Sequence, residues 1–522
     1  MSPTQRRSTS LVLLILVVVL APGCSKEPKT PSTDVRILLL AVDGLEWDLV
    51  LPMAQEGRLP NMRRLMESGS FGFLETFEPT LSPAIWTSVA TGKDRESHGI
   101  LKFQVKDREV KSKGKRRLYN SIDRKTKAFW NILSDYGRRV NTIGWFVTYP
   151  AEEINGVMVA QANTSSREKV QKGDGIHKPQ LEKKVPGQVY PESRTAEVLS
   201  FLDRSDAELA ALRDEVFGTF PHPLGPVETR FWKASDFSFR ADSTYAMIAR
   251  KIVGEGEFDL TAMYIGGTDT VAHRFWRYMR PEKYVHKPSP EQVENFGDII
   301  RKYYVYADRV IGDLMSVAGP DTTVIVISDH GMHEFNENKP FSPEADLKDL
   351  KSGDHPDAPP GIIIASGPGF VQMKLNKPFD KLTRSDLQRV GDVYDITPTL
   401  LVLLNIPVGE DMLGEPLTNI IKPEWLARYP ISTVPSHDTK TWLELQANRT
   451  VPAGDSEEYR KQLRDLGYVD DESLDEADDA AARVERLVDR TQVFENHQVL
   501  PPPGAELDDH AGLVEDQLVE LV

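Results

Sequence analysis

The stretch VRILLLAVDG, residues 35–44, is the clearest indication of the fold. It is a continuous apolar run that ends in an aspartate and a glycine, which is typical of a strand buried inside a parallel sheet. Similar runs recur at 258–269, 321–331 and 361–369, and helical patterns lie between them at 61–69 and 292–318. Strands that alternate with helices predict an α/β fold with a mostly parallel central sheet flanked by helices.

Three of these apolar runs lead into an aspartate, namely Asp43, Asp269 and Asp329. In open α/β sheets the ligand crevice lies beyond the carboxyl ends of the strands, so we expect the three carboxylates to converge. His273 follows Asp269 by four residues, which places both side chains on one face of a helical turn. His330 comes directly after Asp329.

A further histidine, His355, precedes the apolar run at 361–369. Imidazole and carboxylate groups together suit zinc, manganese or iron, and clustered carboxylates repel one another unless a cation is present. Any one of the histidines alone fits an ordinary core or surface position. The joint pattern of three aspartates and three histidines indicates a metal site.

The stretch SPAIWTSVATG, residues 82–92, has two interpretations. The first is a capped helix, with Ser82 as N-cap, Pro83 at the first helical position and apolar residues facing the core. The second adds that a hydroxyl at a helix N-terminus, near N–H groups that favour anions, suits a nucleophile that attacks a phosphate.

The composition limits the classes of function. The chain has 522 residues, 40% of them hydrophobic and 27% charged, which is enough to bury a large core in one large domain with insertions or in two domains. Its net charge of −16 argues against a nucleic-acid-binding protein, because a phosphate backbone requires a basic surface. Small or membrane-bound anions remain candidate ligands where positive charge, including metal, is concentrated locally.

The N-terminus has the order of a secretion signal: Arg6 and Arg7, a short apolar run at 11–20, then small residues. A spanning helix is not predicted, because the apolar run is too short. The sequence APGC at 21–24 resembles a bacterial lipobox, which implies that Cys24 is acylated. Ser25, which follows it, implies a lipid-anchored protein at the outer membrane, facing the periplasm.

The predicted organisation follows from these patterns. It consists of a signal peptide at 1–23, a polar tether at 24–34, a main domain at 35–425 with a cap insertion at about 101–250, and an acidic, helical, partly disordered extension at 426–522. The basic run at 102–117 fits either a solvated loop or a lid over an anionic substrate.

The ordered motifs resemble the alkaline phosphatase superfamily, in particular its type I phosphodiesterase and nucleotide pyrophosphatase branch. The motifs are VDGLEWD, SPAIWTSVATGKDRESHGI, GGTDTVAH, SDHGM and a histidine before GIIIASG, and they span about residues 36–410. The resemblance implies an alkaline-phosphatase-like core that holds two divalent metal ions, typically Zn²⁺, with Mn²⁺ as the alternative.

The resemblance also implies roles for individual residues. Counting back from Gly92 identifies Ser82 as the nucleophile, activated by metal, with Thr80 as the alternative. One metal would be held by Asp43, Ser82, Asp329 and His330, and the second by Asp269, His273 and His355. The implied reaction is hydrolysis of phosphate esters through a covalent phospho-enzyme.

Two departures from the motifs of this superfamily limit the class of substrate. Ile85 stands where nucleotide pyrophosphatases commonly carry an asparagine that holds the phosphate, which argues against nucleotides. The stretch 82–86 lacks the Cys or Ser followed by x-Pro-x-Arg that sulfatases need, which argues against sulfate esters.

We expect a phosphodiesterase that acts on a small phosphate ester or on a lipid or glycan headgroup. The alternatives are a phosphomonoesterase or a phospho-headgroup transferase, for which Lys93 or the basic run could bind the extra charge, and a non-catalytic envelope lipoprotein. The sequence predicts no oligomeric state.

Overall fold

The computed structural model describes residues 33–106, 116–161, 166–167, 179–180, 187–340, 350–357 and 359–449. The predicted signal peptide, Cys24, most of the tether and the tail beyond residue 449 lie outside the described residues. The basic run is described only in part. Among the described helices, none combines the length and the apolar character needed to cross a membrane.

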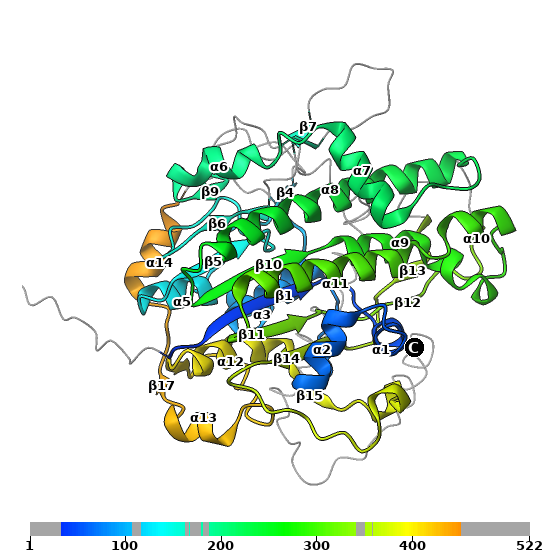
Figure 1. Cartoon of the computed structure of the whole chain (residues 1–522). Helices are drawn as coiled ribbons and strands as arrows, with labels where there is room; N and C mark the ends of the chain where they lie inside the picture. Colours follow the sequence, from blue (N-terminus) through cyan, green and yellow to red (C-terminus); the bar gives the residue numbers. More distant parts are fainter. Residues whose placement is uncertain are drawn as a thin grey trace, which may run out of the picture. The chain divides into compact units, whose positions relative to one another are not determined.

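A nine-stranded sheet forms the centre of the described chain (Figure 1). Five of its eight strand pairings are parallel and three are antiparallel. Across the sheet the order is β15 (Arg389–Asp392), β2 (Ser70–Glu75), β14 (Gly361–Ser366), β11 (Thr322–Ile327), β1 (Arg36–Val42), β10 (Leu260–Ile265), β5 (Val140–Ile143), β6 (Met158–Val159) and β9 (Val189–Tyr190). The four apolar runs of the sequence are β1, β10, β11 and β14, so the predicted strands are confirmed.

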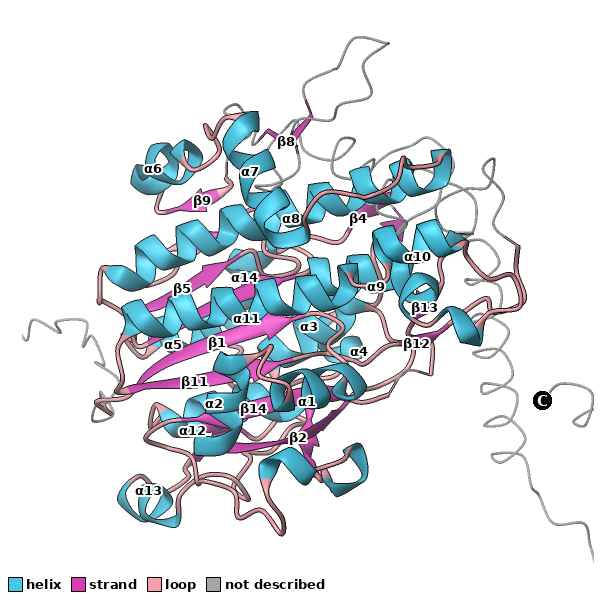
Figure 2. Cartoon of the chain, turned by 45° about the vertical axis from the view of Figure 1, so that its right-hand side comes forward, coloured by secondary structure: helices cyan, strands magenta, loops and turns pink. Residues whose placement is uncertain are grey.

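Helices cover both faces of this sheet (Figure 2). The side chains of β1 alternate between two hydrophobic clusters, because successive residues of a strand point to opposite faces. One cluster joins Leu38, Leu40 and Val42 to α1 (Trp47–Gln55), α2 (Pro60–Ser68), α8 (Pro226–Gly254), α9 (Gly267–Met279) and α11 (Ile299–Ala318). The other joins Ile37, Leu39 and Ala41 to α3 (Ser82–Thr91), α5 (Phe129–Asp135) and α12 (Ile396–Leu403). The predicted α/β class, with a mostly parallel sheet between helices, is confirmed.

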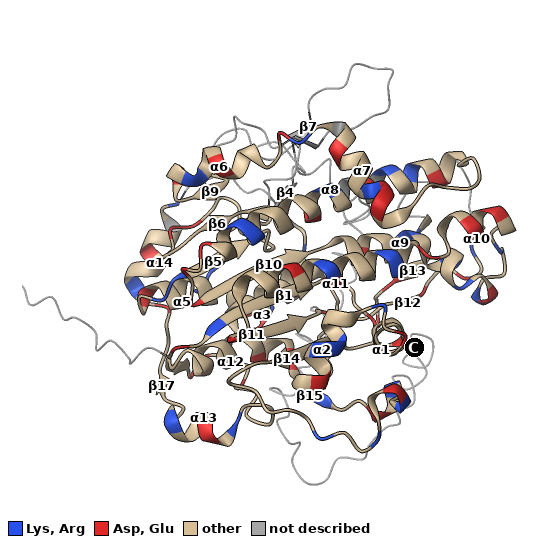
Figure 3. Cartoon of the chain, viewed as in Figure 1, with Lys and Arg blue, Asp and Glu red and all other residues tan. Residues whose placement is uncertain are grey.

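Shorter elements surround this three-layered body. The helices are α4 (Arg95–His98), α6 (Thr195–Ser200), α7 (Asp206–Phe217), α10 (Pro290–Phe296), α13 (Pro423–Arg428) and α14 (Lys440–Ala447). The paired strands are β3 (Gln104–Lys106) with β4 (Arg116–Leu118), β7 (Ser166–Arg167) with β8 (Pro179–Gln180), β12 (His333–Glu334) with β13 (Gly353–Asp354), and β16 (Val408–Gly409) with β17 (Thr433–Val434). Charged residues of both signs are spread over the helices, whereas the central strands are largely uncharged (Figure 3).

Part of the stretch 101–250 belongs to the α/β body. Its strands β5, β6 and β9 extend the central sheet, and α8 packs on one face of that sheet. The hairpin of β3 and β4 and the helices α6 and α7 lie in the same stretch. These strands and α8 therefore belong to the core of the α/β body and not to a cap. The limits of the cap insertion remain a prediction.

Two helix boundaries differ from the sequence-based expectation. The N-cap of α3 is Leu81, whose carbonyl accepts from the Ala84 and Ile85 N–H groups, so Ser82 is the first helical residue and not the cap. The helical pattern at 292–318 forms α10 and α11, separated at Gly297. A side chain at Gly297 would meet the Val293 carbonyl oxygen at 2.7 Å, which favours glycine where the two helices separate.

Candidate metal centre

The register of the sheet brings the three predicted aspartates to one edge. Parallel β1 and β10 pair Val42 with Ile265, and parallel β1 and β11 pair Ala41 with Ile327, so all three strands end at the same level. Asp43 follows β1 directly, Asp329 follows β11 after one serine, and Asp269 lies in the first turn of α9 after β10. The expected convergence at the carboxyl ends of the strands is present.

The first group of ligand-type side chains consists of Asp43, Asp329 and His330. One ligand atom from each lies within 4.8 Å of the others. His330 Nε2 is 3.4 Å from Asp43 Oδ1 and 3.4 Å from Asp329 Oδ2, and all three residues are buried.

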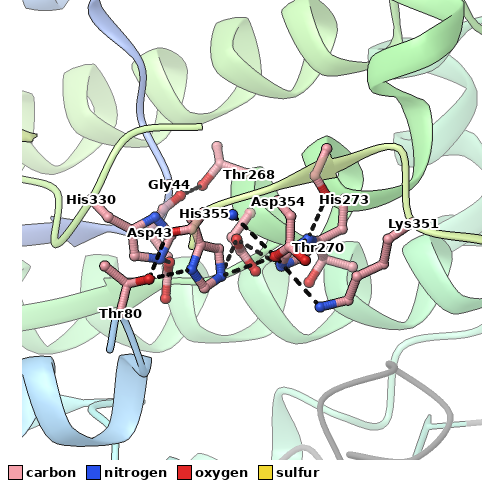
Figure 4. A network of polar contacts seen from close by, with 12 residues as sticks. Asp43, Gly44, Thr80, Thr268, Thr270, His273, His330, Lys351, Asp354 and His355 are labelled. Carbon is pink, nitrogen blue, oxygen red and sulfur yellow. Dashed lines mark hydrogen bonds and ion pairs between the residues drawn. The ribbon is translucent and has the colours of Figure 1, made fainter. Parts of the chain in front are cut away.

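The second group consists of Asp269, His273 and His355, with the same limit of 4.8 Å. Asp269 and His273 are one turn apart on α9, and His273 Nε2 is 3.3 Å from Asp269 Oδ1. His355 Nε2 approaches the same carboxylate at 3.8 Å from the loop before β14. That loop reaches the site because β14 is antiparallel to β11 and starts where β11 ends. Figure 4 shows His355 between His330 and His273, with Asp43 on the side of His330.

Burial and mutual repulsion make this cluster electrostatically unfavourable by itself. Burial, and then the nearby Asp329 and Asp269 carboxylates, raise the pKa of Asp43 well above its usual value. Burial and Asp269 raise the pKa of Asp329 to about 8. Burial, and then the neighbouring His330 and His273, lower the pKa of His355 well below its usual value. A bound divalent cation would offset the repulsion between the carboxylates, and the lowered pKa keeps His355 neutral, which is the form that binds a metal ion.

The hydrogen bonds of the first group support the same interpretation. Asp43 Oδ1, Asp329 Oδ2 and His330 Nε2 are buried and have no hydrogen-bond partner among the described residues. His330 Nδ1 donates to the Gly331 carbonyl at 2.9 Å, which leaves the lone pair on Nε2. Buried polar atoms without partners are costly, so three such atoms that face one another are suited to binding a cation.

The sequence did not single out the residues that orient Asp43. Asp43 Oδ2 accepts from Tyr264 Oη at 2.6 Å and from Trp86 Nε1 at 3.0 Å. The Asp43 carbonyl accepts from the Thr268 hydroxyl. These donors leave Oδ1 as the atom that faces His330, and outer partners of this kind orient metal ligands. Trp86 lies within the singled-out stretch 82–92, whereas Tyr264 is hidden in an apolar strand.

The geometry of α3 decides where Ser82 lies. Trp86 is one helical turn after Ser82, and residues four apart share a helix face. Ser82 therefore lies on the face of α3 that reaches Asp43, at the helix N-terminus, and it is buried. Thr80, the alternative nucleophile, instead contacts His355: its hydroxyl donates to the His355 carbonyl at 2.6 Å.

Lys93 lies just beyond the opposite end of α3, a helix about 15 Å long at 1.5 Å per residue. Its ammonium group is buried in ion pairs with Asp411 at 2.5 Å and Asp438 at 2.7 Å. Because both contacts join α3 to the segment after β16, Lys93 has a structural role. The structure does not bring it to the other predicted site residues, and a role of Lys93 in substrate binding remains a prediction.

Two further residues lie beside the second group. Asp354 Oδ1 is 3.5 Å from His273 Nδ1, and Lys351 Nζ is 3.7 Å from Asp354 Oδ1 (Figure 4). Ile85 is fully buried in the apolar cluster under α3, so this position offers no polar group to a substrate.

Comparisons with known proteins give one family match. The family described as type I phosphodiesterase / nucleotide pyrophosphatase matches residues 37–397, a range that contains both ligand groups and Ser82. No curated protein matches the chain.

Several solved structures are similar in fold. A phosphonoacetate hydrolase from Sinorhizobium meliloti 1021 has 16% identity and a TM-score of 0.34, with 58% of each chain covered. Murine ectonucleotide pyrophosphatase / phosphodiesterase 5 has 12% identity and a TM-score of 0.39, with 74% of this chain and 100% of that chain covered. A variant of the alkaline phosphatase PafA has 13% identity and a TM-score of 0.45, with 75% of this chain and 100% of that chain covered. The chain thus spans little more than half the length of the hydrolase.

Proposed function

The chain belongs to the type I phosphodiesterase / nucleotide pyrophosphatase family, and on this basis we propose that it is a metal-dependent hydrolase of phosphate esters with a preference for diesters. The observation that carries the proposal is the pair of ligand groups at the carboxyl edge of the sheet, next to the N-terminus of α3. We further propose that the substrate is not a nucleotide, because Ile85 is buried and offers no polar group to hold a phosphate.

Each metal ion would have its own set of ligands. Asp43, Asp329 and His330, together with Ser82, would hold one ion, and Asp269, His273 and His355 would hold the other. When bound, two divalent cations, Zn²⁺ or alternatively Mn²⁺, supply Lewis acidity to an in-line displacement at phosphorus and neutralise negative charge.

Ser82 is the proposed nucleophile. Its Oγ forms a bond to phosphorus and loses its proton, while the bond from phosphorus to the leaving alcohol breaks and that alcohol gains a proton. Water then attacks the phosphorus of this seryl phosphodiester: the water oxygen joins the released phosphate monoester, and a proton restores the Ser82 hydroxyl. The hydrogen bonds of Trp86 and Tyr264 hold Asp43 in place throughout both steps.

The proposed location is the cell envelope: a lipid on Cys24 would anchor the protein to the outer membrane, with the protein facing the periplasm. In that location a small phosphate ester or the headgroup of a lipid or glycan is within reach.

The main test uses the full chain, purified without chelator. We expect about two zinc ions per chain, as in two-metal phosphatases, and faster turnover of an aryl phosphodiester than of an aryl phosphomonoester. Absence of bound metal and of turnover, even after zinc or manganese is added, would favour the non-catalytic lipoprotein instead.

Lys351 favours a second candidate function, a phosphomonoesterase or a phospho-headgroup transferase. A monoester carries a second negative charge, and the Lys351 ammonium lies at the edge of the second ligand group, 3.7 Å from Asp354. We expect Lys351→Ala to lower kcat/KM for the aryl monoester about 10-fold and to leave the diester nearly unchanged. Lys377→Ala is the matched control, because Lys377 pairs with Asp386 outside the site. An equal loss on both substrates would contradict a role in charge selection.

A further inference from the structure

The three histidines of the candidate centre differ in what holds their Nδ1 atom. His273 Nδ1 contacts the Gly353 carbonyl at 2.8 Å, and His330 Nδ1 contacts the Gly331 carbonyl at 2.9 Å. A carbonyl can only accept, so in both residues Nδ1 carries the proton and Nε2 carries the lone pair. The backbone fixes these two tautomers whatever the neighbouring side chains are.

In His355 the partner of Nδ1 is a side chain and not a backbone carbonyl. Its Nδ1 is 3.1 Å from the Thr80 hydroxyl, and the same hydroxyl is 2.6 Å from the His355 carbonyl oxygen. A hydroxyl has one proton, which the shorter contact with the carbonyl uses. Toward Nδ1 the Thr80 oxygen can therefore only accept, so the proton lies on His355 Nδ1 and the lone pair on Nε2.

The geometry points to Thr80 as a positioning residue that fixes the tautomer and the ring orientation of His355, and thereby completes the second metal-binding group. This inference rests on the proposed metal-dependent function. Thr80 is suited to the task because it is buried and because its two contacts hold both the ring and the backbone of His355. Only the lone pair of Nε2, which is 3.8 Å from Asp269 Oδ1, remains to bind an ion.

These contacts indicate different roles for the hydroxyl groups of Thr80 and Ser82. The Thr80 hydroxyl donates to one atom of His355 and accepts from another. Ser82, two residues later, shares a face of α3 with Trp86, whose indole N–H donates to Asp43. The short segment from Thr80 to Ser82 therefore links the second ligand group to the first. Thr80 acts through His355 and not as the nucleophile.

The test compares Thr80→Val, which keeps the shape and removes the hydroxyl, with Thr80→Ser, which keeps the hydroxyl. Zinc affinity of the full chain is measured by competition with a chromogenic chelator. We expect Thr80→Val to bind the second ion about 10- to 100-fold more weakly, as is typical when an outer partner of a ligand is lost. Thr80→Ser should stay within about 3-fold of the unaltered protein. The affinity for the first ion should not change, which serves as an internal control for folding.

A second measurement does not depend on metal. Long-range ¹H–¹⁵N correlations of the histidine rings in the metal-free protein report which nitrogen of His355 carries the proton. We expect the Nδ1–H form in the unaltered protein and in Thr80→Ser, and a mixture of both forms in Thr80→Val.

The outcomes separate this inference from the proposed function. Two ions bound with unaltered affinity by Thr80→Val, together with an unchanged tautomer, would overturn the inference and leave the function standing. Full metal affinity with loss of turnover in Thr80→Val alone would also overturn it, because Thr80 would then be the nucleophile. An unaltered protein that binds no metal contradicts the proposed function, and the tautomer measurement still decides the role of Thr80.

Discussion

Replacing Ser82 by alanine is expected to lower kcat by about 10⁴-fold or more, because the reaction then lacks the oxygen that forms the covalent intermediate. Bound metal should fall far less, since Asp43, Asp329 and His330 still supply three ligands. Single-turnover kinetics on an aryl phosphodiester, with metal quantified in the same sample, measure both effects. Trapping of radiolabelled phosphate on the unaltered protein but not on the variant identifies the phosphoserine.

The matched control is Thr87→Ala on the same helix. The Thr87 hydroxyl donates to the Pro83 carbonyl at 2.6 Å, so its loss removes a helix-internal bond and no group of the site. We expect turnover close to that of the unaltered protein. If Ser82→Ala keeps its turnover while Thr80→Ala loses it, the assignment of the nucleophile is wrong and the alternative holds.

The sequence predicted most of the architecture because apolar periodicity reports strands and helices directly. The runs that became β1, β10, β11 and β14 are continuous because both faces of the central sheet are covered. The convergence of Asp43, Asp269 and Asp329 followed from the rule that parallel strands end at one edge. The structure also brings the predicted histidines to these carboxylates, although their role as metal ligands remains a proposal.

Beyond the convergence of the aspartates, individual side-chain contacts between residues distant in the sequence could not be predicted. Tyr264 reads as one more apolar strand residue, and only the pairing of β10 with β1 turns its hydroxyl toward Asp43. Lys93 follows the motif around Ser82, but α3 carries it to the far end of the helix, where Asp411 and Asp438 bind its charge. Proximity to Ser82 in the sequence therefore does not place Lys93 near the candidate centre in space.

The candidate centre also carries a cost in stability, which separates it from the other buried carboxylates of the chain. Asp242, buried on α8, accepts from the Gly266 and Gly267 N–H groups and from the Tyr303 hydroxyl. Burial raises its pKa to about 6, and these donors offset part of that effect. Asp329 has a weaker set, with one long contact of 3.4 Å from the Gly44 N–H group. A site arranged for a cation is therefore strained electrostatically when the cation is absent.

This contrast leads to a prediction about Asp329→Asn, which should abolish turnover and binding of the first ion, yet stabilise the metal-free protein. Burial raises the Asp329 pKa to about 8, so between about pH 4 and pH 8 the folded state binds a proton that the unfolded state releases. The free energy of unfolding of the metal-free protein should therefore fall as the pH rises through this range. Asparagine removes that loss, and we expect a gain on the order of 2 kcal/mol at pH 8.

Urea unfolding of chelator-treated protein at pH 5 and pH 8 measures the effect. Zinc should stabilise the unaltered protein more than the variant, which keeps only the second ligand group. Asp242→Asn is the matched control: because an amide cannot accept all three of its hydrogen bonds, this variant should be destabilised by about 1–3 kcal/mol. The two substitutions remove the same charge from equally buried sites, so opposite signs would show that the first carboxylate is kept for binding a cation and the second for folding. A metal-free Asp329→Asn protein less stable than the unaltered one at pH 8 would mean that Asp329 supports the fold directly.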